Sequence, residues 1–527
     1  MRRLRSDLGI FLLIVAAGLV ARLIDLGDRP FHHDESQVAY FSWRFFDSGD
    51  YEYQPILHGP FMYYLTAFSY VLFGDSDFTA RLMAALMGTL VIGLPYLLRN
   101  QLGRGAAIAA ALLLAFGPTF LYFSRFVRED IFITAINFAL LIAVFRFLDR
   151  PRAGYPALIG ALLAMAFATK EATFITLFVA GTFFLPAVLV QAVRARRAGG
   201  TWRDGDIASK VGSVGWVPWA YGAASFWLVF TILFTVFLTN PPGLWDGIYE
   251  GLSYWLGQQE VGRGGEPWYF YIAVLVGHEW PALLLGLAGA IAVLRRPTLL
   301  GVFLIWAFVM SLAVYSWASE RFAWLVMHPL LPLLLLAGIG VQALLTISPN
   351  RLRLIALPVV AACALYVGYA SFLVNAEHRA DPREFLVSTQ SSEDVKRVVE
   401  RVFGVDGRVF RRTGNRVTVA IDASQGATYP WAWYFRNLPV GYIDMTRPDY
   451  APEAQILVMT DQSRARLLPD LVAYEGRQFR FRVWWVRDWT RKFELDAWTN
   501  WWIGRETWNP KGGLPEWVYV RRDAAAS

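Results

Sequence analysis

Long apolar runs separated by short polar breaks dominate the first 375 residues. The first run follows MRRLRSD and extends from Leu8 to about Ile24, enough to span about 30 Å of hydrocarbon at about 1.5 Å per residue. No small-residue cleavage site follows it, so we expect a retained helix and not a signal peptide. With the later runs, the pattern predicts a polytopic helical membrane protein with about eleven transmembrane helices. The later runs are Phe78–Leu98, Ala106–Tyr122, Ile131–Leu148, Tyr155–Ala168, Phe174–Val193, Trp216–Leu238, Trp268–Leu294, Leu299–Trp317, Phe322–Thr346 and Leu354–Val374.

Basic residues gather in every second connection between these runs. By the positive-inside rule, those connections are cytoplasmic, and so is the N-terminus. An odd number of spans then puts everything after Asn375 outside the cytoplasm, which predicts a multi-pass plasma-membrane protein with an extracytoplasmic C-terminal domain. The basic positions are Arg2, Arg3, Arg5, Arg99, Arg104, Arg146, Arg150, Arg152, Arg194, Arg196, Arg197, Arg203, Lys210, Arg295, Arg296, Arg351 and Arg353.

Two segments interrupt the alternation of spans and loops. Within the first outer connection, Glu35–Phe46 and Pro60–Phe73 are apolar but too short or too broken to cross a bilayer, which predicts helices lying in the interface. The composition then changes to that of a soluble domain, where strand-like and helix-like runs alternate and predict an α/β fold. We therefore divide the chain into a transmembrane domain, 1–375, and an extracytoplasmic domain, 376–527. The second domain is rich in Trp; a core or interfacial anchoring explains most of them, and sugar stacking is the alternative.

Composition agrees with a protein whose main solvent and partner is the bilayer. Hydrophobic residues make up 56% of the chain and charged residues 17%. A net charge of +7 would suggest nucleic acid in a soluble protein, but the basic residues here follow the topology, and no nucleic-acid partner is expected. The single cysteine, Cys363, excludes a disulfide framework and a thiolate metal cluster.

Candidate chemistry begins at HHDES, directly after the first span. Asp34 and Glu35 are paired carboxylates just outside the membrane, and partial desolvation would raise their pKa and suit a general base. Helix capping is the alternative, since Asp34 is a good N-cap and acidic residues favour a first turn. All six histidines of the chain fall on the outer side, and His33 and His58 are candidates for shaping the site.

The string SRFVRED stands at the outer end of the third span. Arg125 and Arg128 are spaced i, i+3, so on a helix both guanidinium groups could face one anion. Glu129 and Asp130 could orient them or an acceptor. The alternative is that interfacial arginines snorkel toward water.

Two further outer loops carry charge. Lys170 is costly in lipid, so it either pairs with Glu171 or binds an anionic head group. Glu320 and Arg321 form a very short turn in SWASERF, which tolerates them without function but would project both toward the same outer cleft. Four short loops that supply charge to one face indicate a site for an anionic lipid-linked substrate.

At these residues the sequence resembles the GT-C class of membrane glycosyltransferases, of the polyprenyl-phosphate-sugar-dependent protein mannosyltransferase and aminoarabinose transferase type. The stretches DES, RFFDSGD and HGPFMYYLTAFSYVLFGDSDFTARLMAALMG carry the resemblance. It implies a catalytic role for Asp34, an acidic neighbour at Glu35, a second acidic position at Asp130 and an outer-facing lysine at Lys170. The stretches SWASERFAWLVMHPLLPLLLLAG and ADPREFLVSTQ resemble a subfamily associated with lipid-linked-glycan flippase activity, which usually has Glu-Lys where this chain has Glu320 and Arg321.

The resemblance implies an inverting glycosyltransferase that moves a sugar from a polyprenyl-phosphate donor to a glycan, lipid or protein acceptor. Asp34 would be the base, and Arg125, Arg128, Lys170 or Arg321 would bind the donor phosphate. A divalent metal, Mg or Mn, held by Asp34, Glu35, Asp130 and His33 is an additional expectation, although some relatives of this class work without one.

Two other functions remain as alternatives. A non-enzymatic accessory protein that binds lipid-linked glycan for a flippase would need the same cationic cleft but no base. A secondary transporter is disfavoured, because the charged residues cluster at one surface and not at the membrane midplane.

Overall fold

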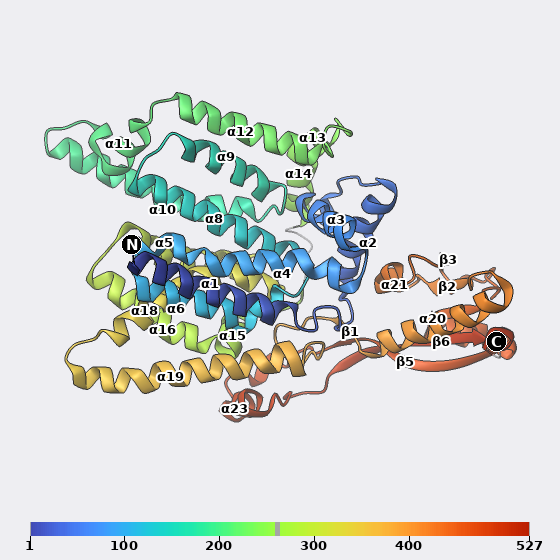
Figure 1. Ribbon diagram of the computed structural model, residues 1–527. Helices are drawn as coiled ribbons and strands as arrows, with labels where there is room; N and C mark the ends of the chain where they lie inside the picture. The colour runs from blue at the N-terminus through green and yellow to red at the C-terminus, as the bar shows by residue number, and fades with distance from the viewer. Residues whose placement is uncertain (1, 259–263, 526–527) are drawn as a thin grey trace.

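The computed structural model describes residues 2–258 and 264–525, with the side chains of residues 2–6, 255, 258 and 350 outside the description. The basic side chains of Arg2, Arg3 and Arg5, and residues 259–263 of an expected outer loop, therefore lie outside the described residues. Figure 1 shows a bundle of roughly parallel helices with a sheet domain projecting from one end. The N-terminus lies at the far end of the bundle from the C-terminus.

Seven helices in the described part of the chain are long and apolar enough to cross a membrane. Two further apolar helices, α15 (Phe270–His278) and α16 (Trp280–Arg295), meet at a bend of 97°, so the pair is either a broken span, which would be the eighth, or a re-entrant loop. The seven are Asp77–Leu102 (α4, Asp77–Gly93, with α5, Pro95–Leu102), α8 (Glu129–Asp149), α10 (Thr173–Arg197), α12 (Val217–Phe234), α17 (Leu299–Trp317), Ala323–Leu345 (ending in α18, Met327–Leu345) and Arg351–Glu377 (mostly α19, Asn350–Phe372).

The remaining predicted runs are also helical. These are α1 (Arg2–Leu23), α6 (Arg104–Phe116) and α9 (Gly154–Phe167). At 13 and 14 residues, α6 and α9 are shorter than a typical span of about 20 residues. Gly117 and Pro118 end α6 before α7 (Pro118–Phe123) begins, because proline cannot continue the hydrogen bonding of the preceding turn. The number of about eleven spans therefore stays a prediction.

The connection between α1 and α4 contains the two expected helices, α2 (His33–Ser48) and α3 (Phe61–Phe73). His32, and not Asp34, is the N-cap of α2. Its Nδ1 accepts the backbone N–H of Asp34 at 3.0 Å, while Glu35 accepts the backbone N–H of His32 at 3.1 Å. This reciprocal capping fixes the first turn of α2 and the direction in which Asp34 leaves it.

The C-terminal domain is α/β, as predicted. Its six-stranded sheet has the order β1-β5-β6-β4-β2-β3, with β2 parallel to β3 and β4 and the other pairs antiparallel. The elements are β1 (Gln390–Ser391), α20 (Asp394–Thr413), β2 (Val419–Asp422), α21 (Thr428–Tyr434), β3 (Val440–Ile443), β4 (Ile456–Thr460), α22 (Asp461–Leu467), β5 (Tyr474–Trp484), α23 (Leu495–Gly504) and β6 (Gly512–Arg521).

This domain docks on the connection between α1 and α4. Trp433 donates its indole N–H to Asp77 at 2.8 Å, and Arg436 pairs with Asp75 at 2.7 Å. Tyr434 accepts the backbone N–H of Phe31 at 3.0 Å. Trp433 is fully buried, so core packing explains it, and the sheet domain covers the chain segment that leads into α2.

Candidate active site

Asp34 forms an ion pair with Arg128 at the start of α8. The Asp34 side chain keeps 26% exposure, whereas Arg128 is nearly buried and stacks over the ring of Trp324 at 3.9 Å. Burial favours a higher pKa for Asp34, but Arg128, followed by the nearby histidines His32, His33 and His58, lowers it to about 2. The prediction of a raised pKa is therefore wrong for the resting protein, because the cation outweighs desolvation. Asp34 is an ionised and partly accessible carboxylate.

Arg128 connects this carboxylate to a second one. Its Nε lies 3.3 Å from Asp130, which in turn accepts a hydrogen bond from Lys170 at 2.8 Å. His328 from α18 lies 3.5 Å from the same Asp130 oxygen. Asp130 and Lys170 are both buried, so their charges stabilise each other in a medium of low dielectric constant. We call Asp34, Arg128, Asp130 and Lys170 the charged cluster.

The cluster joins residues from α2, α8 and the loop between α9 and α10. Lys170 therefore pairs with Asp130 and not with Glu171, which instead pairs with Nδ1 of His58 at 2.8 Å. Glu129 lies beside Arg128, with one carboxylate oxygen 3.8 Å from Nε. The structure thus brings together Asp34, Arg128 and Lys170, as the hypothesis of a single site requires.

Three predicted site residues bind elsewhere. Arg125 donates to the backbone carbonyls of Ile24 and Asn375. Arg321 donates to the backbone carbonyls of Glu266 and Ser316. These contacts hold loops together, so the predicted phosphate-binding role of both arginines is not supported by where they point.

Glu35 is the third, and it is fully buried. Both of its oxygens accept hydrogen bonds from Arg81 at 2.9 Å, and Arg29 donates to one of them at 2.9 Å. The backbone N–H of Val127 also donates to it at 3.2 Å. These donors hold its pKa near 2 against the effect of burial. Glu35 therefore lacks the raised pKa that was expected of a general base, and its buried carboxylate is not open to substrate. Both findings contradict the predicted catalytic role.

The expected metal ligands do not converge. Arg128 holds Asp34, Arg81 and Arg29 hold Glu35, and Lys170 holds Asp130. Among the described residues, no group of three or more His, Cys, Asp or Glu side chains is arranged to hold a metal ion. These carboxylates therefore do not fit a shared Mg or Mn ion.

The C-terminal domain contributes a residue to the site. Arg482 of β5 donates to Nδ1 of His33 at 3.0 Å and to the backbone carbonyls of Gly426 and Tyr429 at 2.9 and 3.1 Å. Burial lowers the pKa of His33, and the Tyr429 ring packs edge-on against its imidazole. Pattern analysis could not find Arg482, because it has no local motif.

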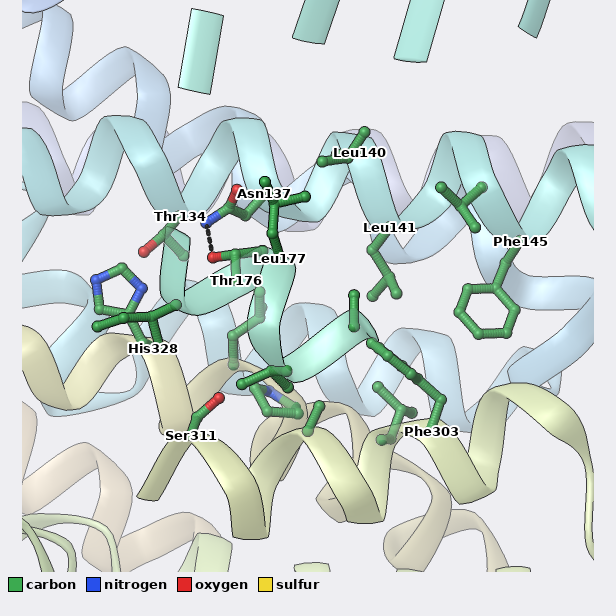
Figure 2. Close-up of a pocket in the computed structure, with 18 of the residues that line it drawn as sticks. Thr134, Asn137, Leu140, Leu141, Phe145, Thr176, Leu177, Phe303, Ser311 and His328 are labelled. Carbon is green, nitrogen blue, oxygen red and sulfur yellow. Dashed lines mark hydrogen bonds between the residues drawn. The ribbon is translucent and has the colours of Figure 1, made fainter. Parts of the chain in front are cut away.

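Two cavities adjoin the charged cluster. The first, of about 210 Å³, is lined by Lys170, Glu171, His58 and Glu320 together with apolar side chains. The second, of about 270 Å³, lies between α8, α10, α17 and α18 (Figure 2). Its lining is mostly apolar, with Asn137 donating to Thr176 at 2.9 Å and His328 at its end. Ile175 and Tyr315 line both cavities, so a polar head and an apolar tail could occupy adjoining spaces.

Three findings from known proteins bear on this site. Residues 57–197 match the dolichyl-phosphate-mannose-protein mannosyltransferase family. Undecaprenyl phosphate-alpha-4-amino-4-deoxy-L-arabinose arabinosyl transferase 1 of Pseudomonas fluorescens (strain Pf0-1) is 27% identical over 289 residues, which are 52% of this chain and 46% of that protein. Transferase 2 of strain Pf-5 is 27% identical over 346 residues, 62% of this chain and 55% of that protein. The chain thus spans about half the length of the curated relatives it matches.

Solved structures extend the likeness to the whole fold. ArnT from Cupriavidus metallidurans, bound to undecaprenyl phosphate, superimposes with a TM-score of 0.63 at 16% identity, over 97% of this chain and 98% of that one. The oligosaccharyltransferase of Archaeoglobus fulgidus, tethered with an acceptor peptide, gives 0.54 at 14% identity, over 90% and 72%. The apolar helices and these relatives agree on a multi-pass membrane protein. The predicted resemblance to GT-C membrane glycosyltransferases is confirmed, and the chain has the fold of ArnT.

Proposed function

We propose that this protein is an inverting glycosyltransferase that uses a polyprenyl-phosphate-linked sugar. The observation that carries the proposal is the charged cluster, in which an accessible carboxylate and two cations meet beside an apolar cavity. The curated relatives named as undecaprenyl-phosphate-aminoarabinose transferases support the same reaction class. The arrangement of basic loops supports a cytoplasmic N-terminus and an extracytoplasmic site in the plasma membrane.

The donor would lie across the two adjoining cavities. Its isoprenoid chain fits the apolar cavity between α8, α10, α17 and α18, where side chains such as Leu141 and Phe303 surround it (Figure 2). Its phosphate then meets Lys170, which lines the neighbouring cavity, and Arg128 beyond it. Both cations are already held in place by Asp130, so they need little reorganisation when charge develops on the leaving phosphate.

Asp34 is the base. Its carboxylate takes the proton from an acceptor hydroxyl, the acceptor oxygen forms a bond to the anomeric carbon, and the bond from that carbon to the phosphate oxygen breaks. The bonding electrons leave with the polyprenyl phosphate, and a single displacement inverts the anomeric centre. Arg128 lowers the pKa of Asp34 to about 2 at rest. Donor phosphate competes for Arg128, so donor binding raises the basicity of Asp34 when a base is needed.

His33, His58, Glu129, Glu171 and Glu320 shape the rest of the cleft on this proposal. The pair of His58 and Glu171 and the side chain of Glu320 form one wall of the cavity that Lys170 lines. His33 lies next to Asp34 in the chain, where Arg482 of the C-terminal domain contacts α2. We expect the acceptor that reaches Asp34 to be the hydroxyl of a glycan, lipid or protein.

The experiment that tests the proposal is Asp34→Asn in purified, reconstituted protein with a labelled polyprenyl-phosphate sugar. General-base loss should slow transfer about 100- to 10,000-fold while donor binding persists. Asp28→Asn is the matched control, since Asp28 lies in the same connection but is 57% exposed and 3.7 Å from Arg379. Transfer at the wild-type rate by a folded Asp34→Asn protein sinks the assignment. A wild-type protein that binds the donor but never consumes it would instead be an accessory carrier-binding protein.

A further inference from the structure

The segment 493–504 of the C-terminal domain presents large apolar side chains to its surroundings. Phe493 is 88% exposed, Leu495 74% and Ile503 71%. The last two belong to α23, and Phe493 lies just before it. A cluster of this kind on a water-soluble surface is costly and marks contact with a partner or a membrane.

Two hydrogen bonds hold α23 against the apolar helices α15 and α19. Trp502 donates its indole N–H to the carbonyl of Val276 in α15 at 3.3 Å, and the Tyr369 hydroxyl of α19 donates to the carbonyl of Ile503. Tyr369 stands eight residues before Glu377, the last residue of that span, which is about 12 Å along a helix. Figure 1 shows α23 along the side of α19, apart from the sheet. The segment therefore contacts α19 within the stretch Arg351–Glu377, which is long and apolar enough to cross a membrane.

A cleft of about 620 Å³ separates α23 from α15. Its walls are apolar and aromatic and include Trp268, Ile272 and Trp498. Lys492 is the one charged side chain among the described residues that line it, and its ammonium lies 3.3 Å from the Tyr269 hydroxyl. One wall belongs to α15 and the other to α23 and the residues just before it, and Trp268 and Ile272 on the first wall are exposed to the surroundings.

We infer that residues 493–504 anchor the C-terminal domain in the bilayer leaflet that faces it, and that a phospholipid occupies the cleft with its phosphate on Lys492. Phe493, Leu495 and Ile503 would enter the acyl region, while the aromatic side chains lie at the head-group level, where Trp and Tyr are favoured. The Lys492 ammonium reaches the phosphate while its methylene chain stays on apolar surface. The anchor fixes the height of the sheet domain above the charged cluster, and it does not depend on the proposed reaction.

A fluorescence experiment on the full chain tests the anchor. The single cysteine, Cys363, is buried and is replaced by Ala; Phe493→Cys then carries an environment-sensitive fluorophore in phosphatidylcholine vesicles. Its emission should shift to the blue and be quenched when the lipid acyl chains are brominated near the glycerol. Gln478→Cys, on the exposed face of β5, is the matched control and should show neither effect. Equal emission and equal quenching at positions 493 and 478 would overturn the anchor.

The lipid phosphate is tested by native mass spectrometry of protein released from phosphatidylglycerol vesicles. Wild-type protein should retain bound phosphatidylglycerol, and Lys492→Gln should retain several-fold less. Lys210→Gln is the control, because Lys210 pairs with Asp206 in α11 (Asp206–Ser213) and lies outside the cleft. Equal retention by wild type and Lys492→Gln would overturn the placement of the phosphate.

Discussion

A guanidinium nitrogen of Arg482 lies 3.0 Å from Nδ1 of His33, the residue that precedes Asp34. The contact joins β5 of the C-terminal domain to the first turn of α2 across 449 positions of sequence. Because arginine only donates, Nδ1 of His33 must be the acceptor, which defines the imidazole tautomer. The C-terminal domain thereby helps to set the orientation of the turn that carries the proposed base.

Arg482→Gln should slow sugar transfer about tenfold, which corresponds to the ~1.4 kcal/mol expected for a lost hydrogen bond to a charged group. The loss should fall on kcat more than on the donor KM, since Arg482 does not touch the donor cavities. Arg482→Lys should restore only part of the rate. Lysine keeps the positive charge and a donor, but one ammonium cannot contact His33 and both carbonyls in the same geometry. Arg477→Gln, exposed on the same strand, is the control. An unchanged kcat in Arg482→Gln would show that His33 is oriented without this contact.

Asp34 and Glu35 are neighbours with opposite expected roles. Glu35→Gln should destabilise the protein by about 3–5 kcal/mol, because it leaves the buried Arg81 without its carboxylate. Asp34→Asn should be much less destabilising, since Arg128 keeps Asp130 as a partner. Thermal unfolding in detergent measures the difference. A Glu35→Gln protein that is as stable as wild type but inactive would return Glu35 to the catalytic residues.

Filling the apolar cavity should raise KM more for donors with a long isoprenoid chain than for donors with a short one. Ala180→Trp places a large ring in the cavity between α8, α10 and α17, and should raise KM for a long polyprenyl-phosphate sugar about tenfold, or ~1.4 kcal/mol. A donor with one or two isoprene units should be affected less. Leu185→Trp, on the same helix but 74% exposed to the surroundings, should leave both values unchanged. Equal effects on long and short donors would place the isoprenoid chain elsewhere.

His32 should make stability depend on pH. Burial lowers its pKa to about 4, so the unfolded chain binds the proton more readily than the folded one. The stabilisation is present above pH 6.5 and is lost as pH falls toward 4, by ~3 kcal/mol if the whole shift counts. Protonation also removes the Nδ1 acceptor that caps α2.

His32→Asn is the matched variant, because asparagine caps a helix without titrating in this range. Its melting temperature should fall less than that of wild type between pH 6.5 and 4.5. Asp34 and Glu35 have a pKa of about 2 in the folded protein, so both stay ionised there throughout this window, and their contribution is largely shared by the two proteins. Parallel pH curves for the two proteins would contradict the role of His32.

The sequence predicted the helices and strands of this fold better than the contacts between them. Apolar runs located the helices, since burial in lipid leaves a long local signal. The two short helices before α4 and the α/β domain were predicted from similar local patterns, while the interfacial position of those two helices stays a prediction. The number of spans is not settled by such patterns, because α6 and α9 are apolar but only 13 and 14 residues long. An apolar composition indicates that a segment lies in lipid or in the protein interior, and the length of the segment decides whether it can cross the membrane.

The site shows the same limit at the level of single side chains. Asp34 and Glu35 look alike in sequence. Glu35 pairs with Arg81, which is 46 positions away, whereas Asp34 pairs with Arg128, which is 94 positions away. Arg125 and Arg128 were expected to face one anion from a helix. They lie in a loop instead, and there they contact different partners. The pairing of cations with carboxylates depends on how α2, α4 and α8 pack together. It cannot be predicted from the spacing of these residues along the chain.

The contact between His33 and Arg482 has a consequence for the order of synthesis. Its first member follows the first membrane helix, whereas its second emerges only after every described span has been made. While the chain is still on the ribosome, α2 therefore has its own cap but lacks the support of β5. The proposed active centre is completed last, and a nascent chain that has not reached residue 482 cannot hold it in its finished form.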